Sequence, residues 1–166
     1  MSVGASPSEG PLGPGRRFGD YEILAELGAG GMGRVYRARD LTLERLVALK
    51  TLAAQFGGDP AFVHRFLKEA RAAARLNHPN IVQIFNLGAQ DDSYFIAMEY
   101  IHGEDVRRVW KRSNQMGRVM PVPLVCRVIM EACAGLDYAH KKVDASGKPL
   151  NIVHRDISPQ NILVTF

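Results

Sequence analysis

The sequence predicts an α+β fold, in which a five-stranded antiparallel sheet carrying one helix is followed by a helical region. Three observations lead to this fold: short segments of alternating polarity before residue 102, a glycine-rich turn between the first two of them, and a helical period after residue 122. The chain has 166 residues, 46% hydrophobic and 23% charged, which is typical of a globular protein with its own core.

The first strands of the sheet follow one another closely. Tyr21, Ile23, Ala25 and Leu27 alternate with Glu22 and Glu26, which is the period-two pattern of a half-buried strand, and Leu24 is the one exception. Similar strands are predicted at 34–39 and 46–52, and turn residues separate them. Strands joined by such short turns predict an antiparallel meander.

A helix and two further strands complete this part of the chain. Asp59 followed by Pro60 is a typical helix start, and we expect the helix to end near Leu76. Apolar residues recur at helical spacing along it, at Phe62, Phe66, Ala70 and Ala73. The last two strands are predicted at 81–87 and 94–101.

Composition divides the chain into three regions. Residues 1–17 are rich in Gly, Pro and Ser and are predicted to be a disordered leader. The sheet and its helix form a domain over 18–102. Residues 103–166 form a mainly helical region, in which Pro123 opens a helix that continues through His140.

Charge and hydropathy narrow the class of protein. The net charge is +4, but the basic residues are scattered, so no nucleic-acid partner is expected. The densest basic group is interpreted as a solvated helix face: Arg107, Arg108, Lys111 and Arg112. No stretch has the length of a membrane span and the N-terminus has no signal-peptide pattern, which predicts a cytoplasmic protein without a membrane segment.

A glycine motif, G-A-G-G-M-G-R-V, occupies residues 28–35 and fits the pattern G-x-G-x-x-G-x-V. Dinucleotide-binding folds use a similar string, but there it opens a helix, whereas here Val35 continues into a strand. A plain hairpin turn stays open as an alternative on this motif alone. Glycines at such a turn would let backbone amides approach phosphate groups closely.

A lysine and a glutamate form the second candidate pair. Residues 47–50 read V-A-L-K, close to V-A-I-K, and they lie on the third predicted strand. Lys50 ends an apolar run, and Glu69 is predicted to lie on the inward face of the helix, so each charge needs a partner. We expect the two to pair, which would place the ammonium on nucleotide phosphates. Separate surface positions are the alternative.

The third motif stands near the C-terminus of the sequence. His154-Arg155-Asp156, with Asn161 five positions after the aspartate, matches H-R-D-L-x-x-x-N except that Ile157 replaces leucine. Asp156 would accept the proton of a substrate hydroxyl, and the amide oxygen of Asn161 would ligate magnesium.

These motifs, in this order, resemble the eukaryotic-type (Hanks-type) Ser/Thr protein kinases of bacteria. L-G-A-G-G-M-G-R-V-Y at 27–36 is similar to their glycine loop, and H-P-N-I-V at 78–82 to their helix-to-strand junction. The resemblance runs from about Phe18 to Phe166 and covers the first part of a kinase domain. It implies a kinase small lobe followed by the helical beginning of the large lobe.

The resemblance also implies ATP and Mg²⁺ as cofactors and a protein Ser/Thr hydroxyl as acceptor. By position, Met98 would be the gatekeeper, Glu99 and Ile101 would offer hinge backbone groups to adenine, and Asp105 would contact the ribose. Val35, Ala48 and Leu163 would sandwich the adenine ring. The full implied ATP site is Leu27, Gly28, Ala29, Gly30, Gly31, Met32, Gly33, Val35, Ala48, Lys50, Met98, Glu99, Ile101, Asp105 and Leu163.

The sequence departs from the kinase pattern in two places. Ser158 stands where Ser/Thr kinases usually carry a lysine, and no D-F-G occurs in the 166 residues. The sequence is therefore interpreted as a kinase truncated after the catalytic loop, without one of the magnesium ligands and without an activation segment. Two functions stay open: an ATP-dependent Ser/Thr protein kinase, and a catalytically inactive nucleotide-binding or regulatory remnant.

Overall fold

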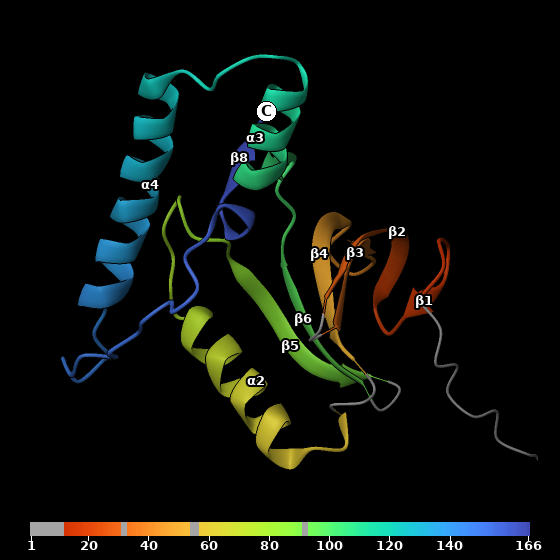
Figure 1. Cartoon of the computed structure of the whole chain (residues 1–166). Coiled ribbons are helices and arrows are strands. Elements are labelled where there is room, and N and C mark those ends of the chain that lie inside the picture. The colour runs from red at the N-terminus through yellow and green to blue at the C-terminus, as the bar shows by residue number, and fades with distance from the viewer. Residues whose placement is uncertain (1–11, 31–32, 54–56, 91–92) are drawn as a thin grey trace, which may run out of the picture. The chain divides into compact units, whose positions relative to one another are not determined.

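The computed structural model describes residues 12–30, 33–53, 57–90 and 93–166. The chain divides into two compact units. The first contains the residues up to 74 together with 84–100, and the second contains 75–83 together with 101–166. Figure 1 shows the elements of both units, which are described separately below.

The described residues of the first unit form an antiparallel sheet with strand order β1-β2-β3-β4-β6-β5 (Figure 1). Its strands are β1 (Arg17–Phe18), β2 (Tyr21–Gly30), β3 (Gly33–Asp40), β4 (Arg45–Leu52), β5 (Ile84–Gln90) and β6 (Ser93–Glu99). Five of the six follow the sequence prediction, and β1 is additional.

The prediction of a disordered leader through Arg17 is wrong for residues 12–17. The backbone amide of Gly15 donates to the carbonyl of Ile23 at 2.8 Å, and the amide of Ile23 donates to the carbonyl of Arg16 at 2.9 Å. Leu12 packs against the core. An apolar residue inside the Gly/Pro-rich stretch anchors it, which its average composition did not reveal. Residues 1–11 lie outside the described residues.

The sheet has a hydrophobic cluster on each face. One cluster consists of Phe18, Tyr21, Ile23, Tyr36, Ala38, Val47, Leu49, Phe95 and Ala97. The other consists of Leu52, Val63, Phe66, Ala70 and Ile96 and lies between the sheet and helix α2 (Pro60–Ala73). Successive residues of β4 point to opposite faces, so this strand contributes to both clusters.

Helix α2 begins where the sequence predicted. The carboxylate of Asp59 accepts hydrogen bonds from the amides of Ala61 at 2.9 Å and Phe62 at 3.2 Å, and Pro60 occupies the first helical position. The helix ends at Ala73, three residues before the predicted end at Leu76. Its buried residues face β5, beside which it lies in Figure 1.

The second unit contains two helices and a small sheet. Its elements are β7 (Gly103–Asp105), α3 (Val106–Gln115), α4 (Val122–Lys141), the short 3-10 helix η1 (Pro159–Asn161) and β8 (Leu163–Thr165). Strands β7 and β8 pair antiparallel. Helix α4 follows the prediction closely, whereas the β7–β8 pair was missed because each strand has only three residues. None of the described helices is long and apolar enough to cross a membrane.

The segment 75–83 belongs to the second compact unit together with 101–166, whereas the predicted domain over 18–102 includes it; those domain bounds stay a prediction. The hydroxyl of Tyr138 on α4 accepts hydrogen bonds from the amide of Asn77 at 3.3 Å and from Nζ of Lys142 at 2.8 Å. These two donors lower the pKa of Tyr138. The ring of His78 packs on that of Tyr138, with centroids 5.1 Å apart. Strand β5 starts at Ile84, three residues after the predicted start at residue 81.

Candidate active site

Strand pairing in the first unit gathers four of the predicted ATP residues on one face of the sheet. Val35 of β3 lies directly opposite Lys50 of β4, and Ala48 of β4 lies opposite Met98 of β6. Residues opposite one another in antiparallel strands share a face, and residues two apart on β4 share it too. The face therefore presents three apolar side chains and one ammonium from three neighbouring strands.

The glycine motif forms the end of the β2–β3 hairpin, where Gly28 pairs with Val35 and Gly30 with Gly33. Gly31 and Met32 lie outside the described residues. Gly33 has φ +146°, and a Cβ there would lie 1.9 Å from the carbonyl oxygen of Thr51. Gly33 is therefore required by the sheet itself.

Gly28 and Gly30 differ from Gly33, because a Cβ at either would meet nothing within 4 Å. Packing within the described residues gives no reason for glycine at these two positions. Open space beside a bare backbone is what a phosphate-binding turn requires, so these residues fit a nucleotide. Leu27 and Ala29, also predicted for the ATP site, are exposed on the same strand.

The predicted inward position of Glu69 is wrong. Glu69 is exposed, and Lys50 is half-buried. No ion pair between them occurs among those of the described residues. The buried residues of α2 are Val63, Phe66 and Ala70. Glu69 lies at the border of the stripe that they form, so a small rotation of the helix about its axis determines whether its side chain faces the sheet or the solvent.

The catalytic motif is organised by hydrogen bonds within the loop. The side-chain amide of Asn161 donates to Oδ2 of Asp156 at 2.8 Å and to the Asp156 carbonyl at 2.9 Å. The amide of Asp156 donates to Nδ1 of His154 at 3.3 Å. Arg155, between them, has φ +66°, so a left-handed residue turns the chain at the motif.

This arrangement leaves acceptor oxygens available at an exposed site. Both donors of the Asn161 amide are directed at Asp156, so its Oδ1 remains as an acceptor, and Asp156 and Asn161 are exposed. Oxygen atoms of this kind are the ligands that Mg²⁺ prefers. Within the described ranges, no group of three or more His, Cys, Asp or Glu residues could hold a metal ion, so a site here would need further ligands.

The remaining predicted ATP residues lie on either side of the boundary between the units. Glu99 ends β6 in the first unit, and Ile101 begins the main part of the second; both are half-buried. Leu163 of β8 is exposed and pairs with Asp105 of β7.

Asp105 has a structural role that sequence reasoning missed. Its carboxylate accepts a hydrogen bond from the amide of Arg108 at 2.8 Å and so caps helix α3. It also forms an ion pair with Nε of Arg108 at 3.4 Å. An aspartate just before a helix is a capping signal, which could have been recognised from the sequence. Contact with ribose stays a prediction for this residue.

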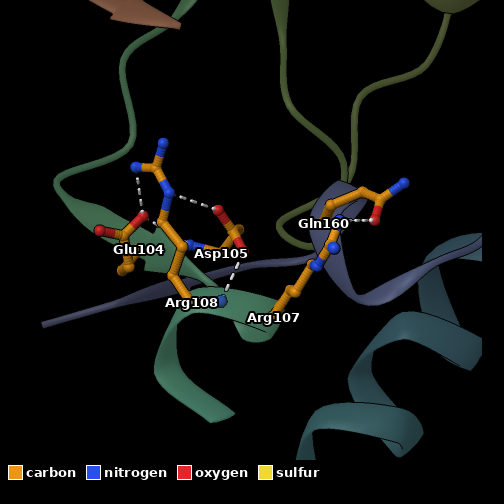
Figure 2. A network of polar contacts seen from close by, with 5 residues as sticks. All are labelled: Glu104, Asp105, Arg107, Arg108 and Gln160. Carbon is orange, nitrogen blue, oxygen red and sulfur yellow. Dashed lines mark hydrogen bonds and ion pairs between the residues drawn. The ribbon is translucent and has the colours of Figure 1, made fainter. Parts of the chain in front are cut away.

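Two further features of the catalytic loop lie around η1. The hydroxyl oxygen of Ser158, where kinases usually carry lysine, is buried without a hydrogen-bond partner among the described residues. The side chain of Gln160 accepts a hydrogen bond from Nη1 of Arg107 at 3.3 Å (Figure 2). The sequence placed Arg107 on a solvated face and gave no signal of this contact.

Comparison with known proteins identifies the family. The family model described as the protein kinase domain matches residues 21–165. The chain belongs to the protein kinase family. Among solved structures, it superposes on the kinase domain of Mycobacterium tuberculosis PknI with a TM-score of 0.76 and 32% identity. That match covers 93% of this chain and 58% of the other, and it confirms the predicted kinase fold class.

Curated relatives of this kinase chain come from bacteria, as the resemblance predicted. It is 41% identical over 152 residues to the tyrosine-protein kinase MasK of Myxococcus xanthus, covering 90% of this chain and 24% of that protein. It is 38% identical over 151 residues to the serine/threonine-protein kinase PrkC of Bacillus subtilis, covering 90% and 22%. The chain thus spans about a quarter of the length of these relatives.

Proposed function

We propose that this protein is an ATP-dependent Ser/Thr protein kinase. The observation that carries the proposal is the Asp156–Asn161 pair, in which one amide group fixes the carboxylate and leaves its own oxygen available. A carboxylate held by hydrogen bonds in an exposed loop is positioned to accept the proton of an incoming hydroxyl.

Nucleotide binding in this proposal uses the sheet face of the first unit. Val35, Ala48 and Met98 would contact the adenine ring, and Lys50 would contact the α- and β-phosphates. Gly28 and Gly30 would bring backbone amides to the phosphates, which the open space beside them allows. Glu99 and Ile101 would provide backbone groups to the adenine edge.

The catalytic groups would then act on the bound nucleotide. Asn161 would hold Mg²⁺ through Oδ1, and Asp156 would take the hydroxyl proton. The nucleotide supplies the phosphoryl group, and magnesium neutralises its charge. In the active enzyme, α2 would turn so that Glu69 pairs with Lys50. This pair would be required for phosphoryl transfer.

The acceptor residue is proposed to be serine or threonine. Pro159, three positions after Asp156, follows the Ser/Thr kinase pattern, and PrkC carries that activity in its name. The name of MasK instead specifies tyrosine, so the identity of the phosphorylated residue has to be measured.

The proposal is tested on the full-length protein with ATP labelled at the γ-phosphate, magnesium and a general protein acceptor. We expect label on Ser and Thr residues, and a loss of about a hundredfold or more in Asp156→Asn, because a general base contributes about 10²–10⁴-fold. The matched control is Asp137→Asn, which removes an exposed carboxylate of α4 that pairs with Lys141. Nucleotide binding without transfer in the unmodified protein would favour the inactive remnant, and label on tyrosine alone would change the acceptor class.

A further inference from the structure

Helix α3 places a cluster of positive charge beside the catalytic loop. Its ten residues, V-R-R-V-W-K-R-S-N-Q, contain four basic residues and no acidic one. Arg107, Arg108, Lys111 and Arg112 are all exposed. The sequence alone favoured a solvated face with no role, but the structure shows where that face lies.

Three contacts fix the start of α3 against the loop, all within the second unit. Nη1 of Arg107 donates to Oε1 of Gln160 at 3.3 Å, and the amide of Val106 donates to the carbonyl of Ile162 at 2.9 Å. One residue before the helix, Asp105 pairs with Leu163 across β7 and β8. Gln160 is the chain neighbour of Asn161, whose amide holds Asp156. Arg107, the first residue of the basic cluster, therefore contacts the residue that directly precedes Asn161 of the proposed catalytic pair.

The four basic residues are not equally neutralised. Arg108 forms ion pairs with Glu104 at 3.1 Å and with Asp105 at 3.4 Å, as Figure 2 shows. Arg107 has a neutral partner, Gln160, in the same view. In the part of the chain that the structure describes, neither Lys111 nor Arg112 forms an ion pair.

Two of the uncompensated charges, those of Arg107 and Lys111, lie on one side of the helix. Arg107 and Lys111 are four residues apart, so they are neighbours on one face, about one helical turn from each other. Arg107 places that face at the catalytic loop. A peptide whose hydroxyl reached Asp156 would then carry its flanking residues near these two cations.

We infer that the basic face of α3 selects acceptor segments that carry Asp or Glu beside the hydroxyl. The inference rests on the proposed kinase function and specifies its substrate class. Carboxylates near the hydroxyl are attracted to Arg107 and Lys111, whereas Lys or Arg at the same places are repelled. Both cations are exposed, so the selection weakens as salt is added.

The test measures peptide binding to the full-length protein at low ionic strength, so that it does not depend on transfer. Two labelled peptides carry Ala in place of the acceptor Ser and differ only in having Glu or Lys on both sides. We expect the Glu peptide to bind more tightly, and Arg107→Gln/Lys111→Gln to weaken it about three- to tenfold, from the usual strength of exposed ion pairs. The control Arg118→Gln/Lys148→Gln removes two exposed basic residues elsewhere in the same unit and should keep the preference.

Other results would overturn the inference. These are equal binding of the two peptides, binding of neither, or the same loss in the control variant. A variant that binds both peptides like the unmodified protein but transfers phosphate more slowly to every Ser-containing peptide would show that Arg107 acts on the phosphoryl group. If these residues bound duplex DNA and the protein showed no peptide preference, the basic face would be a nucleic-acid site and not a substrate site. A separate measurement tests the kinase proposal: if it is wrong, no phosphoryl transfer occurs to the Ser-containing version of either peptide.

Discussion

The two units of this kinase chain hold their proposed site residues in different ways. In the first unit, Val35, Ala48 and Lys50 stand on paired strands, and the intervening Leu49 is completely buried on the other side of the sheet. In the second unit, Asp156 and Asn161 are exposed and are held by hydrogen bonds to each other within a loop.

The distribution of buried apolar residues follows the same division. Both hydrophobic clusters lie in the first unit, whereas in the described ranges the buried apolar side chains of the second unit are Leu76 and Ala139. Helix α4 instead exposes several large apolar residues: Val122, Leu124, Val125, Ile129 and Met130. Substitutions in the sheet should therefore mainly lower the free energy of unfolding. Substitutions in the catalytic loop should mainly lower the rate of phosphoryl transfer.

The largest effect is expected at Gly33. In Gly33→Ala the new Cβ meets the Thr51 carbonyl, and φ stays in a region that alanine avoids, so unfolding should become easier by about 4 kcal/mol. Chemical denaturation of the full-length protein measures this change. Gly28→Ala is the matched control: its stability should change by less than about 0.5 kcal/mol, while its affinity for ATP falls. Equal destabilisation by both variants would contradict the distinction between a structural and a ligand-facing glycine.

The next effect tests the core directly. Leu49→Ala removes a fully buried side chain and should reduce the free energy of unfolding by about 3 kcal/mol. The comparison is Val125→Ala on the exposed face of α4, for which we expect a loss below about 1 kcal/mol. A larger loss at Val125 would mean that the α4 face is covered in the full-length protein.

A smaller effect is expected where the second unit relies on polar contacts. Tyr138→Phe removes the hydroxyl that accepts from Asn77 and Lys142, and it should cost about 1 kcal/mol. Tyr94→Phe, which alters a half-buried tyrosine packed on the first unit's core, serves as the control. Hydrogen exchange at residues 75–83 should speed up in the Tyr138 variant only, and unchanged exchange there would argue against this anchoring contact.

The smallest effect on stability concerns Glu69. Because it is exposed and has no ion pair with Lys50 among the described residues, Glu69→Gln should change the free energy of unfolding by less than about 0.5 kcal/mol. The rate of phosphoryl transfer should nevertheless fall, since the proposed active enzyme needs the pair. If stability fell by several kcal/mol instead, the pair would already exist in the resting protein.

Local signals in the sequence predicted much of this structure. Alternating polarity placed the strands, and Asp59 with Pro60 placed the start of α2, because these features depend only on neighbouring residues. The face shared by Val35, Ala48 and Lys50 follows from the period of a strand once the order of strands is known. For these reasons the position of these residues on one face of the sheet could be predicted from the sequence alone.

The features that were missed depend on contacts or on a helix orientation that the local sequence pattern does not determine. The burial of Glu69 could not be decided from a helix pattern, because the residue lies at the border of the buried stripe. The assignment of 75–83 to the second unit depends on Tyr138, and the contact between α3 and the loop depends on Gln160. Ordering of residues 12–17 depends on pairing with Ile23 rather than on their own composition.

The central claim is that the loop with Asp156 and Asn161 determines the rate of phosphoryl transfer but contributes little to the free energy of unfolding. The most direct test compares phosphoryl-transfer rate and unfolding free energy in full-length Asn161→Ala, which removes the amide that holds Asp156. We predict a loss of transfer of about a hundredfold, typical of removing one positioning group, with a stability change below about 0.5 kcal/mol. Full transfer activity in this variant, or a loss of stability as large as that of Leu49→Ala, would contradict the claim.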